Sequence, residues 1–257
     1  GVNYTLNPVH DSDDVYLTFP AARFDSHNVG NTNVSLTNLQ LSGQDKSNYT
    51  LNVVSKMSAV IEPSSITIVK NSSADSKAIS KVYDGTDEVE LADRLLKSDF
   101  TIRTQYESNV SDMVMFAKQT YSSSNVTSSA SDNVTIVFAL SSSASNNYTL
   151  SQSEFTFTGI ITPLEIPIHW SGTSFEYNGQ NITPVPSYGT IITGDSLTIT
   201  AQVEGEHKNA GNYTATAVLS SSNYIAADGT GSITFTIIPK PITITWVAPA
   251  DLTYSKT

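Results

Sequence analysis

The chain contains no cysteine among its 257 residues, and this absence removes three kinds of chemistry. Disulfide bonds, zinc sites built from thiolates and catalysis by a thiol all require cysteine. Secreted chains that rely on a hydrophobic core also omit cysteine, so its absence does not decide between cellular compartments.

Long apolar runs are missing as well. A membrane-spanning helix needs about 18 consecutive apolar residues, and no stretch of the sequence approaches that length. A secretory signal, with its basic start and short apolar core, is not present either. We therefore expect no membrane insertion by these residues.

Positive charge is scarce. The chain has 13 Lys and Arg residues against 24 Asp and Glu residues, which gives a net charge of −11. Such a field repels phosphate backbones and anionic membranes. The composition therefore excludes nucleic acid as an expected partner.

Recognisable catalytic patterns are also lacking. The four histidines have no metal-ligand spacing, and no Gly-x-Ser-x-Gly elbow offers a nucleophile. The acidic loop from His10 to Asp14 lacks the EF-hand pattern, so we interpret it as a solvated turn. A glycosidase pair of carboxylates can come together in space alone, but small repeated sandwiches disfavour a cleft for it. We expect no enzyme activity, no cofactor and no metal.

The residues that are present favour β-structure. Ser, Thr, Asn and Val dominate, charged residues make up only 14%, and no long segment has apolar residues at helical spacing. This composition and periodicity predict an all-β fold.

One pattern occurs three times and organises the chain. An isoleucine, a proline two residues later and two further isoleucines keep the same spacing in each copy. Proline cannot donate to a strand ladder, so each copy predicts one strand that ends and another that begins. The copies are Ile61-x-Pro63-x-x-Ile66-x-Ile68, Ile161-x-Pro163-x-x-Ile166-x-Ile168 and Ile237-x-Pro239-x-x-Ile242-x-Ile244.

These junctions divide the chain into repeated modules. Residues 1–62 are a partial β module whose N-terminal strands are missing, and residues 63–162 and 163–238 are complete modules. Residues 239–257 begin a further module. Because the connections are short, we expect neighbouring modules to keep a nearly fixed, elongated arrangement.

Further short sequence motifs, which we call words, repeat around the junctions. Asn-Tyr occurs upstream of each one, at Asn48, Asn147 and Asn223, and Tyr83-Asp84-Gly85-Thr86 and Tyr177-Asn178-Gly179 follow two of them. Together with Asn-Ala-Gly-Asn-Tyr-Thr at 209–214, these words resemble the YDG and MBG repeat families of large bacterial surface proteins and adhesins. The resemblance covers nearly the whole chain. It implies a YDG-type module at 63–162 and an MBG-type module at 163–238, with structural and not catalytic motifs.

Each module is expected to be a small Ig-like β-sandwich. Gly211 precedes Tyr213 by two residues, which is typical of a tyrosine corner, and we expect Gly211 at positive φ or against Tyr213. For 63–162 a β-grasp arrangement remains open, with Glu88–Ser98 as its one short helix because Leu91, Leu95 and Leu96 share a face. The strands predicted for the first module are 2–6, 15–19, 33–41, 49–54 and 57–61.

Exposed aromatics next to turns are the candidate ligand contacts, because rigid aromatic faces offer contact area at low entropic cost. Trp170 and Trp246 hold equivalent positions, where packing inside the module is favoured over stacking on a sugar ring. The candidates are Trp170, Tyr177, Tyr188 and Tyr121.

These observations predict a non-catalytic, extracellular repeat segment of a bacterial surface protein, acting as an adhesin stalk or cell-adhesion module. A host or extracellular-matrix protein or a glycan is the expected partner, and the segment itself is expected to be a monomer. The alternative is a carbohydrate-binding accessory module of a secreted glycan-degrading enzyme.

Overall fold

The computed structural model describes residues 4–18, 21–52, 56–127, 131–248, 250 and 254. In these residues every element longer than four residues is a strand, so the predicted all-β class is confirmed. The helices of the described ranges have at most four residues, too few to span a membrane. The chain forms two compact units: 1–78 with 93–120 and 134–157, and 79–92 with 121–133 and 158–257.

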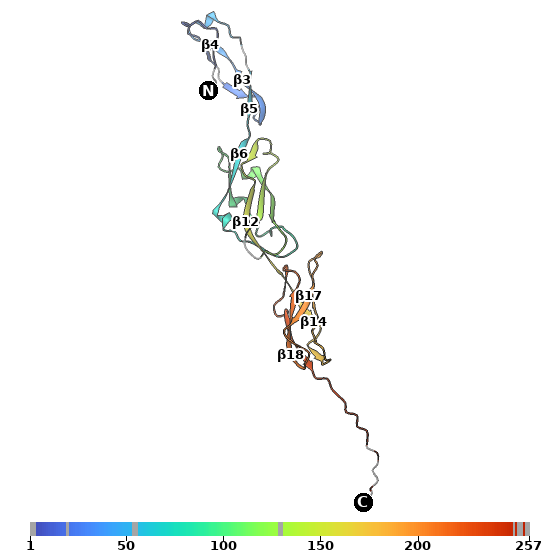
Figure 1. Cartoon of the computed structure of the whole chain (residues 1–257). Helices are drawn as coiled ribbons and strands as arrows, with labels where there is room; N and C mark the ends of the chain where they lie inside the picture. The colour runs from blue at the N-terminus through green and yellow to red at the C-terminus, as the bar shows by residue number, and fades with distance from the viewer. Residues whose placement is uncertain are drawn as a thin grey trace. The chain divides into compact units, whose positions relative to one another are not determined.

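The first 61 residues form two small antiparallel sheets (Figure 1). One pairs β1 (Tyr16–Thr18) with β4 (Gln40–Ser42). The other has the order β2-β3-β5, from Ala21–Phe24, Gly30–Thr37 and Lys56–Ile61. A 3-10 helix, η1 (Lys46–Asn48), precedes Tyr49. None of the described residues from 4 to 62 is buried.

The strands predicted in this first part are found in part. Those at 15–19, 33–41 and 57–61 correspond to β1, to β3 with β4, and to β5. Residues 49–52 form no strand, so that prediction is wrong there, and 53 and 54 lie outside the described residues. Of the strand expected at 2–6, residues 2 and 3 lie outside them too, and 4–6 form no strand.

A three-stranded sheet follows the first junction. β6 (Ser64–Lys70) pairs in parallel with β11 (Tyr148–Leu150) and antiparallel with β8 (Phe100–Arg103). The alternating residues Ile66 and Ile68 of β6 are buried, as the period of two predicts. Beside it lies an aromatic core, in which the Phe100 ring is 4.9 Å from that of Phe138.

A four-stranded sheet has the order β7-β12-β10-β9. Every second residue of β12 is buried, and its last four residues pair in parallel with β7. The strands are β7 (Ile79–Val82), β12 (Glu154–Thr162), β10 (Ser131–Leu140) and β9 (Val114–Tyr121).

Residues 164–238 carry three sheets. β13 (Leu164–Ile166) pairs in parallel with β19 (Tyr224–Ala226), and β14 (Ile168–Trp170) pairs antiparallel with β16 (Pro186–Tyr188). The third sheet, of order β15-β20-β18-β17, holds a core of Ala215, Phe235 and Ile237. Its strands are Ser174–Glu176, Ser232–Ile238, Gly211–Leu219 and Ile199–Val203.

The junction pattern behaves as predicted at two of its three copies. β5 ends at Ile61 and β6 begins at Ser64, just after the first junction proline. β12 ends at Thr162 and β13 begins at Leu164, just after the second. β20 ends at Ile238, but residues 240–248 form no strand.

The predicted helix at Glu88–Ser98 is wrong. Residues 91–93 are a turn, Leu91 is 81% exposed, and only η2 (Lys97–Asp99) is helical. The side-chain amide of Gln119 explains this, because it accepts from the Leu95 N–H at 2.9 Å and donates to the Leu95 carbonyl at 3.0 Å. A helix over 88–98 would pair this N–H with the Leu91 carbonyl, and it would leave the Leu95 carbonyl among its last four unpaired carbonyls. The α-helix lies instead at α1 (Ser72–Asp75), and η3 is Ser111–Met113.

The tyrosine corner of the third module is confirmed. The Tyr213 hydroxyl donates to the carbonyl of Asn209, four residues upstream, at 3.0 Å. Gly211 does not have positive φ, and a Cβ there would meet the Tyr213 ring at 3.7 Å. Of the two expectations for Gly211, the position against Tyr213 is the one that holds.

Candidate functional site

The Tyr-Asp-Gly-Thr word forms a tight turn directly after β7. Gly85 has φ of +81°, a conformation that glycine adopts without the steric cost of a Cβ. The Asp84 carboxylate accepts from the Thr86 backbone N–H and from its hydroxyl, each at 2.9 Å. An aspartate that bonds its own backbone two residues on is a common way to fix a turn.

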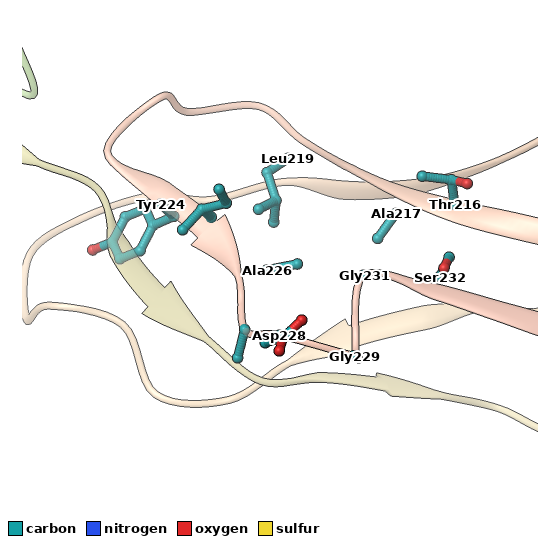
Figure 2. Close-up of a pocket in the computed structure, with 11 residues that line it drawn as sticks. Thr216, Ala217, Leu219, Tyr224, Ala226, Asp228, Gly229, Gly231 and Ser232 are labelled. Carbon is teal, nitrogen blue, oxygen red and sulfur yellow. The ribbon is translucent and has the colours of Figure 1, made fainter. Parts of the chain in front are cut away.

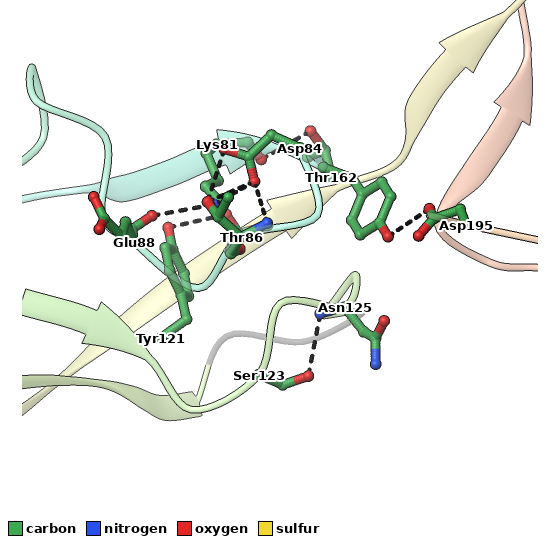
Figure 3. A network of polar contacts seen from close by, with 11 residues as sticks. Lys81, Asp84, Thr86, Glu88, Tyr121, Ser123, Asn125, Thr162 and Asp195 are labelled. Atoms are coloured by element: carbon green, nitrogen blue, oxygen red, sulfur yellow. Dashed lines mark hydrogen bonds and ion pairs between the residues drawn. The ribbon is translucent and has the colours of Figure 1, made fainter. Parts of the chain in front are cut away.

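A buried lysine holds this turn from inside. The Lys81 side chain is fully buried, and Nζ donates to Asp84 Oδ1 at 2.6 Å (Figure 3). Nζ also donates to both oxygens of Thr86, at 2.8 Å to the carbonyl and 2.9 Å to the hydroxyl, and to the Glu88 carbonyl at 3.1 Å. An ammonium group is tolerated in a core only when its donors are satisfied in this way.

The charge pair is visible in the titration of Asp84. Burial acts to raise its pKa, but the hydrogen bonds from Lys81 and Thr86 outweigh burial and lower the pKa below its ordinary value. The lowered pKa favours the charged carboxylate beside Lys81.

The tyrosine of the word points away from this lysine and contacts residues beyond the next junction. Tyr83 is 4% exposed, and its hydroxyl donates to Asp195 Oδ2 at 2.7 Å. Tyr224 donates its hydroxyl to the same oxygen, and the two rings meet edge to face with centroids 5.5 Å apart. The Ile192 N–H completes the group by donating to the Tyr224 hydroxyl oxygen at 3.1 Å.

One carboxylate shared by two phenols shifts all three pKa values. Burial and then the hydrogen bond to Asp195 raise the pKa of Tyr83 to about 12. Burial and the bond to Asp195 also raise the pKa of Tyr224. The hydrogen bonds from Tyr224 and then Tyr83 hold the pKa of Asp195 below its ordinary value. The phenols stay protonated and the carboxylate stays charged over the neutral range.

Part of this group recurs in the first module. The Tyr49 hydroxyl donates to Asp13 Oδ2 at 2.6 Å, and the His10 N–H donates to the Tyr49 hydroxyl oxygen at 3.1 Å. The hydrogen bond to Asp13 raises the pKa of Tyr49. The acidic loop from His10 to Asp14 is therefore more than the solvated turn that its composition suggested.

Asp13 and Asp195 each close a turn by donating their N–H to the carbonyl three residues upstream, at 3.0 Å to His10 and 3.1 Å to Ile192. Asp99 makes the same backbone bond to Leu96 at 2.9 Å, but its carboxylate accepts from the Leu96 N–H at 2.8 Å and not from a tyrosine.

The repeated Asn-Tyr word makes a second kind of contact, which we call the asparagine clasp. Asn223 Oδ1 accepts from the Val126 N–H at 3.0 Å, and its Nδ2 donates to Asn125 Oδ1 at 2.9 Å. Asn147 repeats this, accepting from Val29 at 2.9 Å and donating to Asn28 at 3.3 Å.

The backbone of each clasp asparagine holds the junction strand as well. The Asn223 carbonyl accepts from the Leu164 N–H at 2.9 Å, and the Asn147 carbonyl accepts from the Ser64 N–H at 3.0 Å. Each asparagine therefore binds a loop through its side chain and the residue after a junction proline through its backbone.

A profile of the YDG domain matches residues 1–59 and 66–155, which is more than half of the chain. The chain belongs to the YDG domain family. The matched segments contain the turn with Lys81 and the clasp residues Asn28, Val29 and Asn147. A search of the curated proteins found no match.

The aromatics predicted from the sequence lie in different environments of this YDG protein. Trp170 is half-buried against the core of Phe235, and its Nε1 donates to the Thr230 carbonyl at 3.1 Å. Tyr188 is half-buried and donates to the Leu197 carbonyl at 2.9 Å. Tyr177 is 37% exposed, whereas Tyr121 is 2% exposed, so the expectation of an exposed Tyr121 is wrong. The structure does not bring these four together as one group through any contact it records among the described residues.

Sequence reasoning missed Lys81 because nothing in the sequence shows that this lysine is buried, and it missed Asp195 because the tyrosine partners of such an aspartate lie at no fixed spacing. Asp13 precedes its tyrosine by 36 residues, whereas Asp195 precedes its tyrosine by 29. The signal that was available is an aspartate that precedes a strand in each module: Asp13 before β1, Asp99 before β8 and Asp195 before β17.

The described part of this YDG protein has open, shallow recesses on its surface. A recess of about 490 Å³ lies beside β18, β19 and β20, and of the residues lining it Asp228 is the one with a charge (Figure 2). Small residues such as Ala217, Ala226 and Gly231 form its floor. This recess therefore holds no pair of carboxylates, whereas a second recess, of about 650 Å³, is lined by Asp87 and Glu88 beside Gly85 and Thr86. Within the described ranges, no three His, Asp or Glu residues lie together as a metal site.

Proposed function

We propose that the chain is a non-catalytic, extracellular repeat segment of a bacterial surface protein, acting as an adhesin stalk or cell-adhesion module. Its modules are small Ig-like sandwiches, with an MBG-type module at 163–238, joined in an elongated array. The observation that carries this proposal is the asparagine clasp, because the same atoms make the same contacts twice along the chain.

The chemistry of the clasp suits a stalk. A clasp asparagine uses its side-chain amide and its backbone carbonyl on two different segments, so movement of either segment breaks hydrogen bonds. Tyr83 and Tyr224 add two hydrogen bonds to one carboxylate, and bonds to a charged acceptor are stronger than neutral ones. Contacts of this kind resist bending of the chain. They need no catalytic reaction by the side chains that make them.

Location is tested on intact cells that carry the full-length protein. Brief protease treatment of the cells should release peptides from residues 1–238, whereas peptides of a cytosolic marker should stay behind. Peptides that appear only after the cells are lysed would contradict an extracellular location.

The arrangement is tested by small-angle X-ray scattering of the purified chain. An elongated array predicts a maximum dimension close to the summed lengths of its modules. A compact particle would contradict it.

Binding is tested on an array of glycans and matrix proteins. Tyr177→Ala is the informative variant, because Tyr177 is exposed, whereas Trp170→Ala would disturb the core and is unsuitable. Saturable binding to a polysaccharide that Tyr177→Ala abolishes would favour the accessory-module alternative. Turnover of a glycan by the chain would contradict the non-catalytic proposal.

A further inference from the structure

Asn178 and Gly179 form the single Asn-Gly pair of the sequence, and they lie in an exposed turn of the third module. Gly179 has φ of +80°, which glycine adopts without the steric cost of a Cβ. The start of the turn is fixed, because the Tyr177 N–H donates to the Ile238 carbonyl at 3.0 Å. The backbone of this turn is therefore defined, although its side chains are in water.

The Asn178 side chain is held over this backbone. Its Oδ1 accepts from the Gln180 N–H at 2.9 Å, so the side chain closes a ring that encloses the peptide nitrogen of Gly179. In the part of the chain that the structure describes, the Gly179 N–H has no hydrogen-bond partner. One small ring thus contains an amide carbon, Asn178 Cγ, and an unoccupied backbone nitrogen.

This ring has the parts of a nucleophilic substitution at an amide. The nucleophile is the Gly179 nitrogen and the electrophile is Asn178 Cγ. The Gln180 N–H already donates to Oδ1, the oxygen on which negative charge develops during the attack. Because glycine carries no side chain on its Cα, its nitrogen is the least hindered that could stand at this position.

We propose that Asn178 is a site of spontaneous deamidation through a cyclic imide. The Gly179 nitrogen forms a bond to Asn178 Cγ and gives its proton to solvent, while the bond from Cγ to Nδ2 breaks and the amide group takes up a proton and leaves as ammonia. Water then opens the imide. Attack of water at Cγ gives aspartate, and attack at the backbone carbonyl carbon of residue 178 gives isoaspartate, so both products form. Water is the one co-reactant.

Asn109 provides a comparison within the same chain. It is exposed, and its Oδ1 accepts from the Ser111 N–H at 3.1 Å, which is the same bond two residues on. The residue between them is Val110, whose N–H donates to the Ile102 carbonyl at 3.0 Å and whose side chain is fully buried. A nitrogen that is hydrogen-bonded and lies beside a branched, packed side chain is a poor nucleophile. We therefore expect Asn109 to keep its amide under conditions in which Asn178 loses it.

Deamidation adds a negative charge to the turn. The aspartate product makes the word at 177–179 read Tyr-Asp-Gly, as at 83–85. The lysine that holds the aspartate of that earlier word has no counterpart here, because Phe175 takes its place. The new carboxylate therefore stays on the surface beside Tyr177, which is 37% exposed. This covalent change does not depend on the proposed function.

Peptide mapping by mass spectrometry tests the proposal on the purified full chain, incubated folded in neutral buffer. The peptide with Asn178 should gain about one mass unit with time, because an NH₂ group is replaced by OH, and it should contain both aspartate and isoaspartate. The peptide with Asn109 should stay unchanged in the same sample. Isoelectric focusing should show the intact chain becoming more acidic, at the position of the variant Asn178→Asp.

A pair of glycine variants tests the nucleophile. Gly179→Ala places a methyl group beside the attacking nitrogen and should slow the mass gain, and its Cβ would meet only the Tyr177 hydroxyl, at 4.0 Å. Gly205→Ala also places a Cβ at positive φ, +69°, with nothing within 4 Å, so it carries a similar strain and should deamidate at the rate of the parent. Thermal melts check that both variants are folded.

An Asn178 that keeps its amide, or that loses it no faster than Asn109, overturns the proposal. Aspartate without isoaspartate also overturns it, because direct hydrolysis of the amide gives aspartate alone. A folded Gly179→Ala that deamidates as fast as the parent overturns the role of the Gly179 nitrogen. If Gly179→Ala does not fold, the comparison of Asn178 with Asn109 in the parent chain decides.

Discussion

At the scale of single residues, each position of the Tyr-Asp-Gly-Thr word has a separate structural task. Tyr83 binds Asp195 across a junction, Asp84 binds Lys81 within the module, and Gly85 supplies the positive φ between them. The word therefore couples a buried charge pair to a contact with a residue beyond Pro163 through one tight turn.

Lys81→Met tests the buried charge pair. It removes four hydrogen bonds from the turn, and we expect a loss of stability of about 1.5–3 kcal/mol, the range for bonds to charged groups. The loss should be smaller than for a fully enclosed pair because the Asp84 side chain is 40% exposed and water can replace the lysine. Denaturant unfolding measures it. Lys208→Met, which removes an exposed ion pair with Glu206, should have little effect, and equal effects would contradict the assignment.

The shared carboxylate predicts a pH dependence with two limits. The lowered pKa of Asp195 means that its contribution is complete above the ordinary carboxyl value of about 4 and is lost as pH falls further. The raised pKa of Tyr83, about 12, means that its contribution is complete below the ordinary phenol value of about 10 and is lost as pH rises toward 12.

Thermal melting from pH 2 to pH 12 measures both limits. Asp195→Asn should flatten the acid limb, and spectrophotometric titration should show the two tyrosines ionising at lower pH than in the parent. Asp228→Asn, which removes an exposed carboxylate of the same module, should leave both observations unchanged. Tyrosine titrations that are identical in parent and Asp195→Asn would refute the shared-carboxylate assignment.

At the scale of elements, turns and strand starts follow from neighbouring residues. The predicted helix at Glu88–Ser98 is absent, and a side chain distant in sequence binds the backbone there. The leucines at 91, 95 and 96 have helical spacing, yet the Gln119 amide takes the backbone groups of Leu95. A glutamine on β9 cannot be identified as that partner from sequence spacing. The β12 pattern, by contrast, was readable because alternation with period two is a local property.

A pair of glycine variants separates turn strain from packing. Gly85→Ala and Gly205→Ala both place a Cβ at positive φ, with φ of +81° and +69°, and each should lose about 1 kcal/mol through strain alone. At Gly85 the Cβ would also lie 3.0 Å from Ile192 Cγ2, whereas at Gly205 nothing lies within 4 Å. We expect Gly85→Ala to be the more destabilising in thermal melts. Equal melting temperatures would mean that the turn does not press on Ile192.

At the scale of the whole molecule, one small set of contacts is made twice along the chain, by Asn147 and by Asn223. The clasp asparagines 147 and 223 are half-buried, whereas Asn48 of the first copy of the word is exposed. The asparagine of the repeated word is therefore half-buried where its side chain forms a clasp and exposed at Asn48.

Asn223→Ala tests the clasp. It removes the acceptor of the Val126 N–H, so hydrogen exchange at that amide should accelerate, while exchange in the core strand β18 should stay slow. Asn48→Ala, made in the same repeated word at an exposed position, should leave the Val126 amide unchanged in dilute solution. Unchanged exchange at Val126 in Asn223→Ala would show that the clasp does not protect this amide.

The sequence alone determined the all-β class, the strands on either side of Pro63 and Pro163, and the tyrosine corner at Tyr213. These features depend on neighbouring residues, through alternation, the missing proline N–H and a hydrogen bond across four residues. Only the tertiary structure revealed the Lys81 network, the shared Asp195 carboxylate and the asparagine clasp. The partners of Asp195 and of the clasp asparagines are distant in sequence, so no fixed spacing could have joined them, whereas the partners of Lys81 lie three to seven residues downstream and only its burial was hidden in the sequence.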